Sequence, residues 1–424
     1  MAKKKKKVQK PPRELTRRQL AKWEQQQRRQ RLIFIAGASV IGAVLLMILL
    51  GWFISDFLPL RQTVITVNGR HFNLGYYIDS LKIRGQGQQA QTLYSLADQV
   101  VTEIETMELT RGAAADLGVN ITRDEIEEER ARGSLPENQA ALDAVRYNLT
   151  LNRLLDVHFE REVPKSAEQV HVMAMLLESE QQAADIRQQL VNGEDFTALA
   201  REFSLEPATS TREGDLGWHP AGVLPSMMGT GVVEDYAFGS PVGTLSQPRL
   251  DADIQKHVGY WLIKVLSWED EEKTSAHVLA MALGSADEAE KVLARLENGE
   301  DFAALAGEFS QLPNAKDNGG DVGIIQEGQA STVFNDYVFG GEMALDVVSP
   351  ALQDKTIATQ GGYWLIKVVE KEDDREITRE DRDLLKVQAL DWWVAQLWTD
   401  PANQVESSLT TDQKDRAVKA VLNP

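Results

Sequence analysis

The sequence predicts an α+β protein of several domains that follow one membrane-spanning helix. Three observations lead to this prediction. A run of 24 residues, 32–55, contains no charge; a thirteen-residue phrase occurs twice, as "NGEDFTALAREFS" (192–204) and "NGEDFAALAGEFS" (298–310); and apolar residues at helical spacing flank the repeated region. The chain has 424 residues, which is more than one core usually holds, so we expect two to four domains.

The charge-free run "LIFIAGASVIGAVLLMILLGWFIS" is long enough to cross a membrane. As a helix it would extend over about 36 Å, and such a helix satisfies its backbone polar groups internally. A cleaved signal peptide is the alternative, but the run is long for one and no A-x-A-like cleavage site follows. We therefore predict a retained transmembrane helix over 32–55, with Trp52 and Phe53 at the interface.

The charges on either side of this run predict its orientation. Residues 1–31 contain thirteen Lys and Arg and only two Glu, which is typical of a basic cytoplasmic tail. The whole chain carries −19, so the part from Arg61 onward carries about −29. We expect anionic lipid beside the tail, no nucleic-acid partner for the acidic part, and most of the chain outside the cell membrane.

Several classes of site are missing from the sequence. The chain has no cysteine, so disulfides, thiolate nucleophiles and cysteine-based metal sites are excluded. Its six histidines form no H-E-x-x-H motif, and the sequence contains no EF-hand loop, Walker loop or Rossmann fingerprint. We therefore predict no metal and no cofactor.

Residues 62–165 predict a short β-rich start followed by helices. "TVITVNGRHF" is interrupted by Asn68-Gly69, a strong hairpin signal. In "TRDE", Thr122 and Glu125 have the spacing of a capping box, and another helix is expected over 141–162. One helical stripe is formed by Leu93, Leu96, Val100, Ile104 and Met107.

The sequence predicts the same fold for two consecutive segments, residues 166–270 and 271–373. Each repeat has a first strand ("QVHVMAMLL", "AHVLAMAL"), the shared helical phrase, a glycine-bounded strand entry ("GDLGW", "GDVGI") and a last strand ("GYWLIKVL", "GYWLIKVV"). Gly193 is placed to end a helix in the left-handed conformation, and Asp195 to cap the next one. Because the pieces keep their order, we expect two tandem domains of similar topology.

Residues 374–424 predict a C-terminal helix and tail. The helix carries an apolar stripe that needs a partner, formed by Leu384, Val387, Leu390, Val394 and Leu397. The helical region before Pro164 is the best candidate, in which case the two ends of the part that follows the anchor meet. The pair Trp392-Trp393 could stack on a ligand, but we predict that it forms a packing surface.

The repeated motifs resemble those of the parvulin family of peptidyl-prolyl isomerases, and their arrangement resembles bacterial foldases of the SurA and PrsA kind. The resemblance covers about 200 residues in two copies, and 62–165 is similar, by a looser pattern, to the N-terminal chaperone region of those foldases. It implies that each repeat is a four-stranded antiparallel sheet covered by helices. It also implies rotation about X–Pro bonds, a step with a barrier of about 20 kcal/mol that needs no nucleophile.

In the family, two histidines and a Cys or Asp form a polar network beside the proline site. The resemblance places the first-strand histidine at His171 and His277, and the acid at Glu206 in the first repeat. The second repeat has Leu312 at the acid position. His171 and Glu206 could form a polar network, or each histidine could be a satisfied residue on a sheet face. The predicted catalytic residues are therefore His171, Glu206 and His277.

The last-strand histidine is replaced by Trp261 in one repeat and Trp364 in the other. A tryptophan keeps one N–H donor but has no acceptor and no titratable charge. The resemblance further implies an apolar proline pocket, with Phe334 and Phe339 in the second repeat and Ala330 where the family has Met. The first repeat has five extra residues before "EDYAF", which ends in Phe238. Predicted substrate-binding residues are Phe238, Trp261, Phe334, Phe339 and Trp364.

Two functions compete on these observations. The first is a membrane-anchored extracytoplasmic folding factor, a parvulin-type isomerase and chaperone with weak or degenerate catalysis, acting on exported polypeptides with X–Pro bonds. The alternative is a non-catalytic holdase whose parvulin-like domains only bind peptide. Glu206 and Phe334 favour the first; Trp261, Trp364 and Leu312 favour the second.

Overall fold

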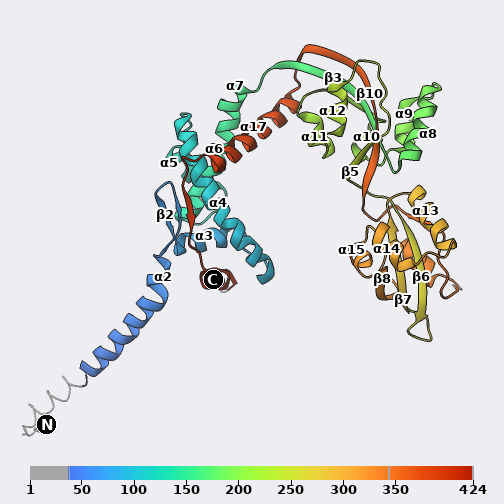
Figure 1. Cartoon of the computed structure of the whole chain (residues 1–424). Helices are drawn as coiled ribbons and strands as arrows, with labels where there is room; N and C mark the ends of the chain where they lie inside the picture. Colours follow the sequence, from blue (N-terminus) through green and yellow to red (C-terminus); the bar gives the residue numbers. More distant parts are fainter. Residues whose placement is uncertain (1–36, 38, 342–343, 423–424) are drawn as a thin grey trace, which may run out of the picture. The chain divides into compact units, whose positions relative to one another are not determined.

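The computed structural model describes residue 37, residues 39–341 and residues 344–422. The predicted basic tail (1–31) and the start of the predicted membrane span lie outside the described residues. The chain divides into two compact units: unit 1 combines Met1–His158 with Leu390–Pro424, and unit 2 is Phe159–Ala389. Figure 1 shows the elements of both units along the chain.

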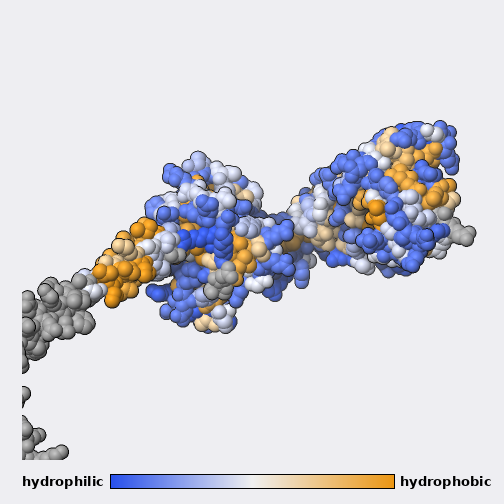
Figure 2. All heavy atoms as spheres, turned by 90° about the horizontal axis from the view of Figure 1, so that it is seen from below, coloured by the Kyte–Doolittle hydropathy of each residue, from blue (hydrophilic) through white to orange (hydrophobic). Residues whose placement is uncertain are grey.

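One described helix, Ser39–Leu60, is long and apolar enough to cross a membrane by length and composition. It contains a π-helical turn, η1 (Phe53–Phe57), and ends with α2 (Leu58–Leu60). Its apolar side chains, among them Ile48 and Leu49, are exposed, and Figure 2 shows them as a mostly orange surface. The helix overlaps the predicted span and continues beyond residue 55.

Unit 1 joins a small antiparallel sheet to a group of helices. Its strands are β1 (Thr63–Val67), β2 (Arg70–Asn73) and β11 (Val405–Ser407), in the order β11-β1-β2. Its helices are α3 (Leu74–Gly85), α4 (Ala90–Asp116), α5 (Arg123–Arg132), α6 (Gln139–Arg153), η2 (Leu154–Phe159) and α18 (Thr411–Leu422). The predicted stripe on 93–107 lies on α4 and packs into the unit's core.

The local signals of this unit are confirmed. Asn68 and Gly69 connect β1 to β2 with φ values of 48° and 80°, the left-handed conformations that a tight hairpin turn requires. Thr122 caps α5, and its hydroxyl and the Glu125 carboxylate form the two reciprocal bonds of a capping box. Gly118, with φ of 76°, follows the end of α4.

The prediction that the C-terminal helix returns to the N-terminal region is confirmed. α17 (Arg379–Thr399) ends with Leu397 in the core of unit 1, and β11 pairs with β1. Near the start of α17, the Arg382 guanidinium donates to the carbonyl oxygens of Val163 and Pro164. Trp393 packs against the core of unit 1, as predicted, whereas Trp392 is 66% exposed, so the packing prediction is wrong for Trp392.

Unit 2 contains two four-stranded antiparallel sheets covered by helices. The first sheet has the order β4-β3-β10-β5 and the second has the order β8-β7-β6-β9. The strands are β3 (Ser166–Leu177), β4 (Asp215–Pro220), β5 (Arg249–Lys256), β6 (Gly259–Trp268), β7 (Ser275–Leu283), β8 (Asp321–Gln326), β9 (Leu352–Asp354) and β10 (Thr359–Glu376). We call each sheet with its helices the first domain and the second domain.

The helices follow the sequence repeats. Those of the first domain are α8 (Glu180–Val191), α9 (Phe196–Phe203), α10 (Pro207–Thr211), α11 (Val223–Met228) and α12 (Val232–Gly239). Those of the second domain are α13 (Ala286–Glu297), α14 (Phe302–Phe309), α15 (Pro313–Asp317) and α16 (Thr332–Phe339). The short α7 (Glu160–Glu162) precedes the first sheet. The predicted cap at Asp195 is confirmed, since its side chain accepts from the Thr197 N–H.

The last strands of the two repeats are exchanged between the sheets. β10, from the second repeat, pairs with β3 of the first repeat, while β6, from the first repeat, pairs with β7 of the second. Figure 1 shows the red β10 beside the green β3. The expectation that each repeat forms its own sheet is therefore corrected. Because both strands contain "GYWLIKV", each sheet can accept either strand with nearly the same contacts.

The two segments of the chain that cross between the sheets run antiparallel to each other. Thr359 lies opposite Lys256, and its hydroxyl donates to the Val258 carbonyl oxygen. Lys256 is only 2% exposed, and its ammonium group donates to the carbonyl oxygens of Gln360 and Gly361. Burial lowers the pKa of Lys256 to about 8, and the negative charges of nearby glutamates, which raise this pKa, offset only part of the lowering.

Strand exchange can be tested with engineered cysteines, because the chain has none of its own. Lys367 on β10 lies opposite Met173 on β3, and Lys264 lies opposite Leu279. We expect the pair Met173→Cys with Lys367→Cys to form a disulfide, since facing residues of neighbouring strands meet its geometric needs. Peptide mass spectrometry under non-reducing conditions would identify the link.

The matched control combines Met173→Cys with Lys264→Cys, the pair that would meet if each repeat closed its own sheet. A disulfide in this control, without one in the first pair, would contradict the exchange.

The buried Lys256 predicts a pH dependence of stability. Its pKa is about 8 in the folded chain and near 10.4 when unfolded, so between these values the unfolded state binds more protons. The free energy of unfolding should therefore rise with pH over this window, by at most about 3 kcal/mol from this group. Urea unfolding at pH 7 and pH 10 should show a smaller rise in Lys256→Met than in the parent chain. An equal rise in both proteins would exclude Lys256 as the source.

Candidate functional site

An aromatic cluster in the second domain brings together most of the predicted pocket residues. Trp261 on β6 meets Phe334 on α16 edge to face, with ring centroids 5.3 Å apart. Phe339, Ala330 and Leu312 are half-buried against the same cluster. We call these five residues the aromatic site. Because of strand exchange, its tryptophan comes from the first repeat and its phenylalanines come from the second.

A buried carboxylate holds Trp261 in place. The Trp261 indole N–H donates to Asp354 Oδ2 at 3.0 Å, and the Ser331 hydroxyl donates to the same oxygen. Asp354 Oδ1 accepts from the backbone N–H and the hydroxyl of Thr356, at 2.8 and 2.7 Å. Burial alone would raise the pKa of Asp354, which is 1% exposed, but these hydrogen bonds favour the carboxylate and lower its pKa overall.

The first domain contains an equivalent tryptophan that is completely enclosed. Trp364 on β10 has no exposed surface, and its indole N–H donates to Asp251 Oδ2 at 3.0 Å. It packs against Leu224 and Met228 on α11, and Phe238 is half-buried against the same cluster. We expected each tryptophan to lie with the other residues of its own repeat. Instead, Trp364 packs with residues of the first repeat and Trp261 with residues of the second.

Sequence reasoning missed both of these aspartates, although a signal was present. Asp251 and Asp354 each stand ten residues before the tryptophan of their own repeat. The repeat spacing could therefore have identified them as equivalent. Strand exchange then pairs Asp354 with Trp261 and Asp251 with Trp364, so that each aspartate binds the tryptophan of the other repeat.

The two first-strand histidines lie on the sheet faces opposite the tryptophans. Side chains alternate along a strand, and Val170 and Val172 belong to the cluster that contains Trp364, so His171 points to the other face. The same alternation holds for His277, because Ala276 and Val278 pack with Trp261. Neither histidine therefore shares a face with the aromatic residues predicted to bind substrate.

Each histidine is paired with an aspartate that the sequence analysis did not select. His171 Nε2 lies 2.8 Å from Asp215 Oδ1, and His277 Nε2 lies 2.9 Å from Asp321 Oδ1. The His277 ring and the Gly323 N–H lower the pKa of Asp321. Both aspartates belong to the "GDLG" and "GDVG" motifs, and each follows its histidine by 44 residues, which was the available signal.

Glu206 does not join His171 in a polar network. Its carboxylate turns back to accept from the Ala208 N–H at 3.2 Å, as the N-cap of α10. The histidine and the glutamate therefore bond to different partners. Leu312, at the equivalent position of the second repeat, has an apolar side chain that packs in the aromatic site.

This arrangement offers apolar contact rather than proton chemistry. None of the five residues of the aromatic site is titratable, and the Asp354 carboxylate behind Trp261 already accepts four hydrogen bonds. Among the described residues no group of His, Asp and Glu is arranged to hold a metal ion. Trp261 and Phe334 are themselves buried, at 8% and 3% exposed, so the apolar surface that a ring such as that of proline could contact comes from the half-buried members of the cluster, such as Phe339.

Comparisons with known proteins agree with this fold. Residues 171–267 and 272–372 each match a PPIC-type PPIase domain. The chain is 27% identical to the chaperone SurA of Alkalilimnicola ehrlichii over 65% of this chain and 65% of that protein. It is 28% identical to the foldase protein PrsA of Caldanaerobacter subterraneus over 39% of this chain and 56% of that protein. With the chaperone SurA of Chromohalobacter salexigens, the identity is 28% over 69% of this chain and 62% of that protein.

The chain spans less than two thirds of the length of each of these curated relatives. The matched domain ranges follow the sequence repeats, whereas the sheets do not, because the last strands are exchanged.

The two buried aspartates provide a matched stability test. Asp354→Asn should destabilise the chain by about 1.5 to 3 kcal/mol, because an amide NH₂ would meet donors that now point at a carboxylate. Asp251→Asn should cost less, about 1 kcal/mol, since among the described residues the Asp251 side chain accepts only from Trp364. Denaturant unfolding followed by tryptophan fluorescence would measure both free energies. Equal costs would show that the additional donors around Asp354 contribute nothing.

Proposed function

This chain is a SurA/PrsA-like protein with two PPIC-type domains, and from that premise we propose that it is a membrane-anchored folding factor for exported polypeptides. In this proposal it acts outside the cytoplasm, as a chaperone with weak parvulin-type isomerase activity. Its substrates are unfolded or extended chains, particularly those with X–Pro bonds. The observation that carries the proposal is the aromatic site of the second domain, formed around Trp261 and Phe334.

The N-terminal segment supports the location. The helix Ser39–Leu60 has the length and composition of a membrane span, and thirteen Lys and Arg precede it within residues 1–31. Positive residues beside a span favour the cytoplasmic side, so the part of the chain from Arg61 onward would lie on the opposite side. The basic residues would then contact anionic lipid.

The aromatic site supports isomerisation through binding alone. Rotation about an X–Pro bond is accelerated when a site binds the twisted amide more tightly than the planar one. Phe339, which is half-buried, would contact the proline ring and remove water from it, while the buried Phe334 supports the cluster from within. The Trp261 N–H is already bonded to Asp354, so it is not free to stabilise the substrate carbonyl. Little electrostatic stabilisation remains, which is why we propose weak activity.

The alternative is a holdase that binds peptide without chemistry. The complete burial of Trp364 favours this alternative for the first domain, because the indole fills the space beside α11. In the second domain, Leu312 offers no hydrogen bond to a twisted amide. The predicted catalytic residues His171, Glu206 and His277 are proposed instead to stabilise local structure, through the bonds described above.

A proline-isomerisation assay on the full chain in detergent tests the proposal. Phe339→Ala should lower kcat/KM about tenfold or more, because it removes apolar contact from the proposed proline site. Phe309→Ala is the matched control, since Phe309 is also half-buried but packs on the other face of the same sheet. His171→Ala, His277→Ala and Glu206→Ala should retain the activity of the parent chain.

If His171→Ala, His277→Ala or Glu206→Ala loses activity, the substituted residue contributes to catalysis. If the parent chain suppresses aggregation of an unfolded client but does not accelerate isomerisation, the holdase is correct. If it does neither, the proposed function is wrong.

A further inference from the structure

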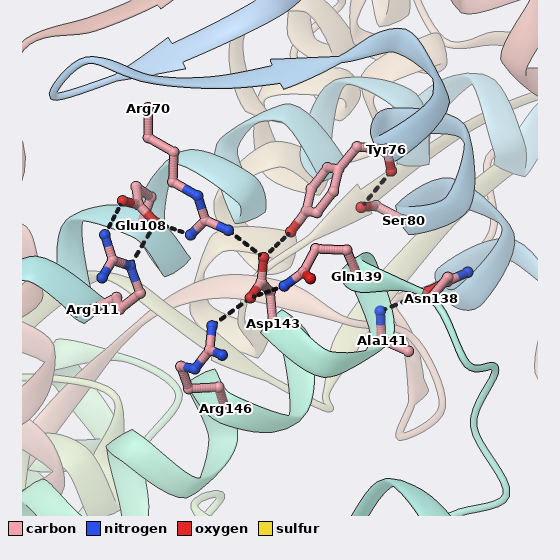
Figure 3. Close-up of polar contacts among 10 residues, drawn as sticks. All are labelled: Arg70, Tyr76, Ser80, Glu108, Arg111, Asn138, Gln139, Ala141, Asp143 and Arg146. Carbon is pink, nitrogen blue, oxygen red and sulfur yellow. Dashed lines mark hydrogen bonds and ion pairs between the residues drawn. The ribbon is translucent and has the colours of Figure 1, made fainter. Parts of the chain in front are cut away.

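Unit 1 contains a network of ion pairs that the proposed function does not use. At its centre are two carboxylates, Glu108 on α4 and Asp143 on α6, each only 6% exposed. Arg70 on β2 bridges them, with Nη1 2.5 Å from Glu108 and Nη2 2.8 Å from Asp143. Figure 3 shows the three side chains converging from separate elements. Burying two carboxylates is costly unless each is paired, so the ion pairs with Arg70 offset part of that cost.

Two further arginines flank this centre. Arg111 binds Glu108 in a bidentate manner at 2.8 and 2.5 Å, and Arg146 Nη1 lies 2.5 Å from Asp143. Tyr76 also donates to Asp143, at 3.2 Å, and burial together with the Asp143 charge raises its pKa, so its hydroxyl stays protonated. Three guanidinium groups therefore face two carboxylates, which leaves one positive charge without a counter-charge in the network.

The three arginines also line a cavity of about 490 Å³ on the outer side of the network. None of the described residues that line this cavity is acidic; Glu108 and Asp143 lie beneath it. Apolar side chains, Val119 and Ile121, lie beside the arginines, and Asn120 adds a polar group. We call this cavity the arginine pocket.

The pocket retains hydrogen-bond donors for a ligand. Within the described part of the chain, Nη1 of Arg111 and both Nε and Nη2 of Arg146 donate to no residue. The part of the chain from Arg61 onward, these arginines included, carries about −29, so a cavity lined by three arginines and no acidic residue contrasts with the charge of that part as a whole. Guanidinium groups present parallel N–H donors that match the two oxygens of a carboxylate.

We propose that the arginine pocket binds a carboxylate of a polypeptide, either the free C-terminus or an acidic side chain. The guanidinium donors would bind the two oxygens, and Val119 and Ile121 would contact an adjacent apolar side chain. The choice of a polypeptide rests on the proposed function; the choice of a carboxylate rests on the pocket itself.

Fluorescence anisotropy with the full chain in detergent tests this proposal. Three labelled, proline-free peptides share one short apolar sequence: one has a free α-carboxylate, one is amidated, and one is amidated and contains a single internal glutamate. We expect the amidated peptide without glutamate to bind at least tenfold more weakly than one of the others. Whichever of the other two binds identifies the source of the carboxylate.

Substitutions locate the binding in the pocket. Arg146→Gln should weaken binding of the carboxylate peptide roughly tenfold, because it removes charge-assisted hydrogen bonds, while Asp143 keeps Arg70, Tyr76 and Gln139. Asn120→Asp should weaken binding to a similar extent by placing a negative charge in the pocket without changing the network. Arg132→Gln is the matched control, since this exposed arginine pairs with Glu128 and Glu129 on α5 and does not line the pocket.

Equal binding of all three peptides would overturn the proposal, as would equal loss in Arg132→Gln and Asn120→Asp. Displacement of the carboxylate peptide by inorganic phosphate at a lower concentration than by unlabelled peptide would also overturn it, since the site would then prefer a small anion. Because the peptides lack proline, binding here is measured separately from isomerisation and from client aggregation. Either proposal can therefore fail without the other.

Discussion

Unit 2 depends on one constraint. The last strand of each repeat pairs with the first strand of the other repeat, and the two last strands are similar in sequence. β10 crosses from the second repeat to β3, and β6 crosses from the first repeat to β7, so neither sheet is complete without both repeats. Buried contacts hold the two crossing segments together: the side chains of Lys256 and Thr359 each donate to a backbone carbonyl group of the other segment. The two domains consequently share their strands, and a perturbation of one last strand reaches the site of the other repeat.

The tryptophans on these strands change what the sites can do. Each indole N–H is bonded to a buried aspartate, Asp354 for Trp261 and Asp251 for Trp364, so the polar atom of the side chain is used for positioning. A site built this way offers shape and apolar surface but no group that titrates near neutral pH. That favours a protein whose main action is to bind extended chains, with catalysis as a secondary effect of binding. The exposed surface of unit 1 adds charge recognition through the arginine pocket.

Unit 1 is assembled from both ends of the part of the chain that follows the anchor. β11 joins the β1–β2 hairpin, and α18 contributes Ala417 and Val418 to the same core as Val64 and Tyr77. Unit 2 is thus an insertion between the two segments of the chain that form unit 1. Those segments must pair for unit 1 to fold, and the folding of unit 2 brings them together. The entropic cost of closing such a long insertion grows only slowly with its length, so the hairpin and helix contacts can offset it.

The sequence by itself determined the local structure and the identity of the repeats. Spacing along one segment encodes which face is apolar and where a helix begins, so the Asn68-Gly69 hairpin and the capping box at Thr122 were predictable, whereas Phe334 and Phe339 were selected through the resemblance to the parvulin family. Only the tertiary structure decided the pairing of the last strands, because two segments that begin with the same seven residues give no local preference for one sheet. It also decided that His171 and Trp364 lie on opposite faces of the same sheet. The meeting of arginines from β2, α4 and α6 around Glu108 and Asp143 was likewise decided by tertiary structure, since those contacts join elements distant in the chain.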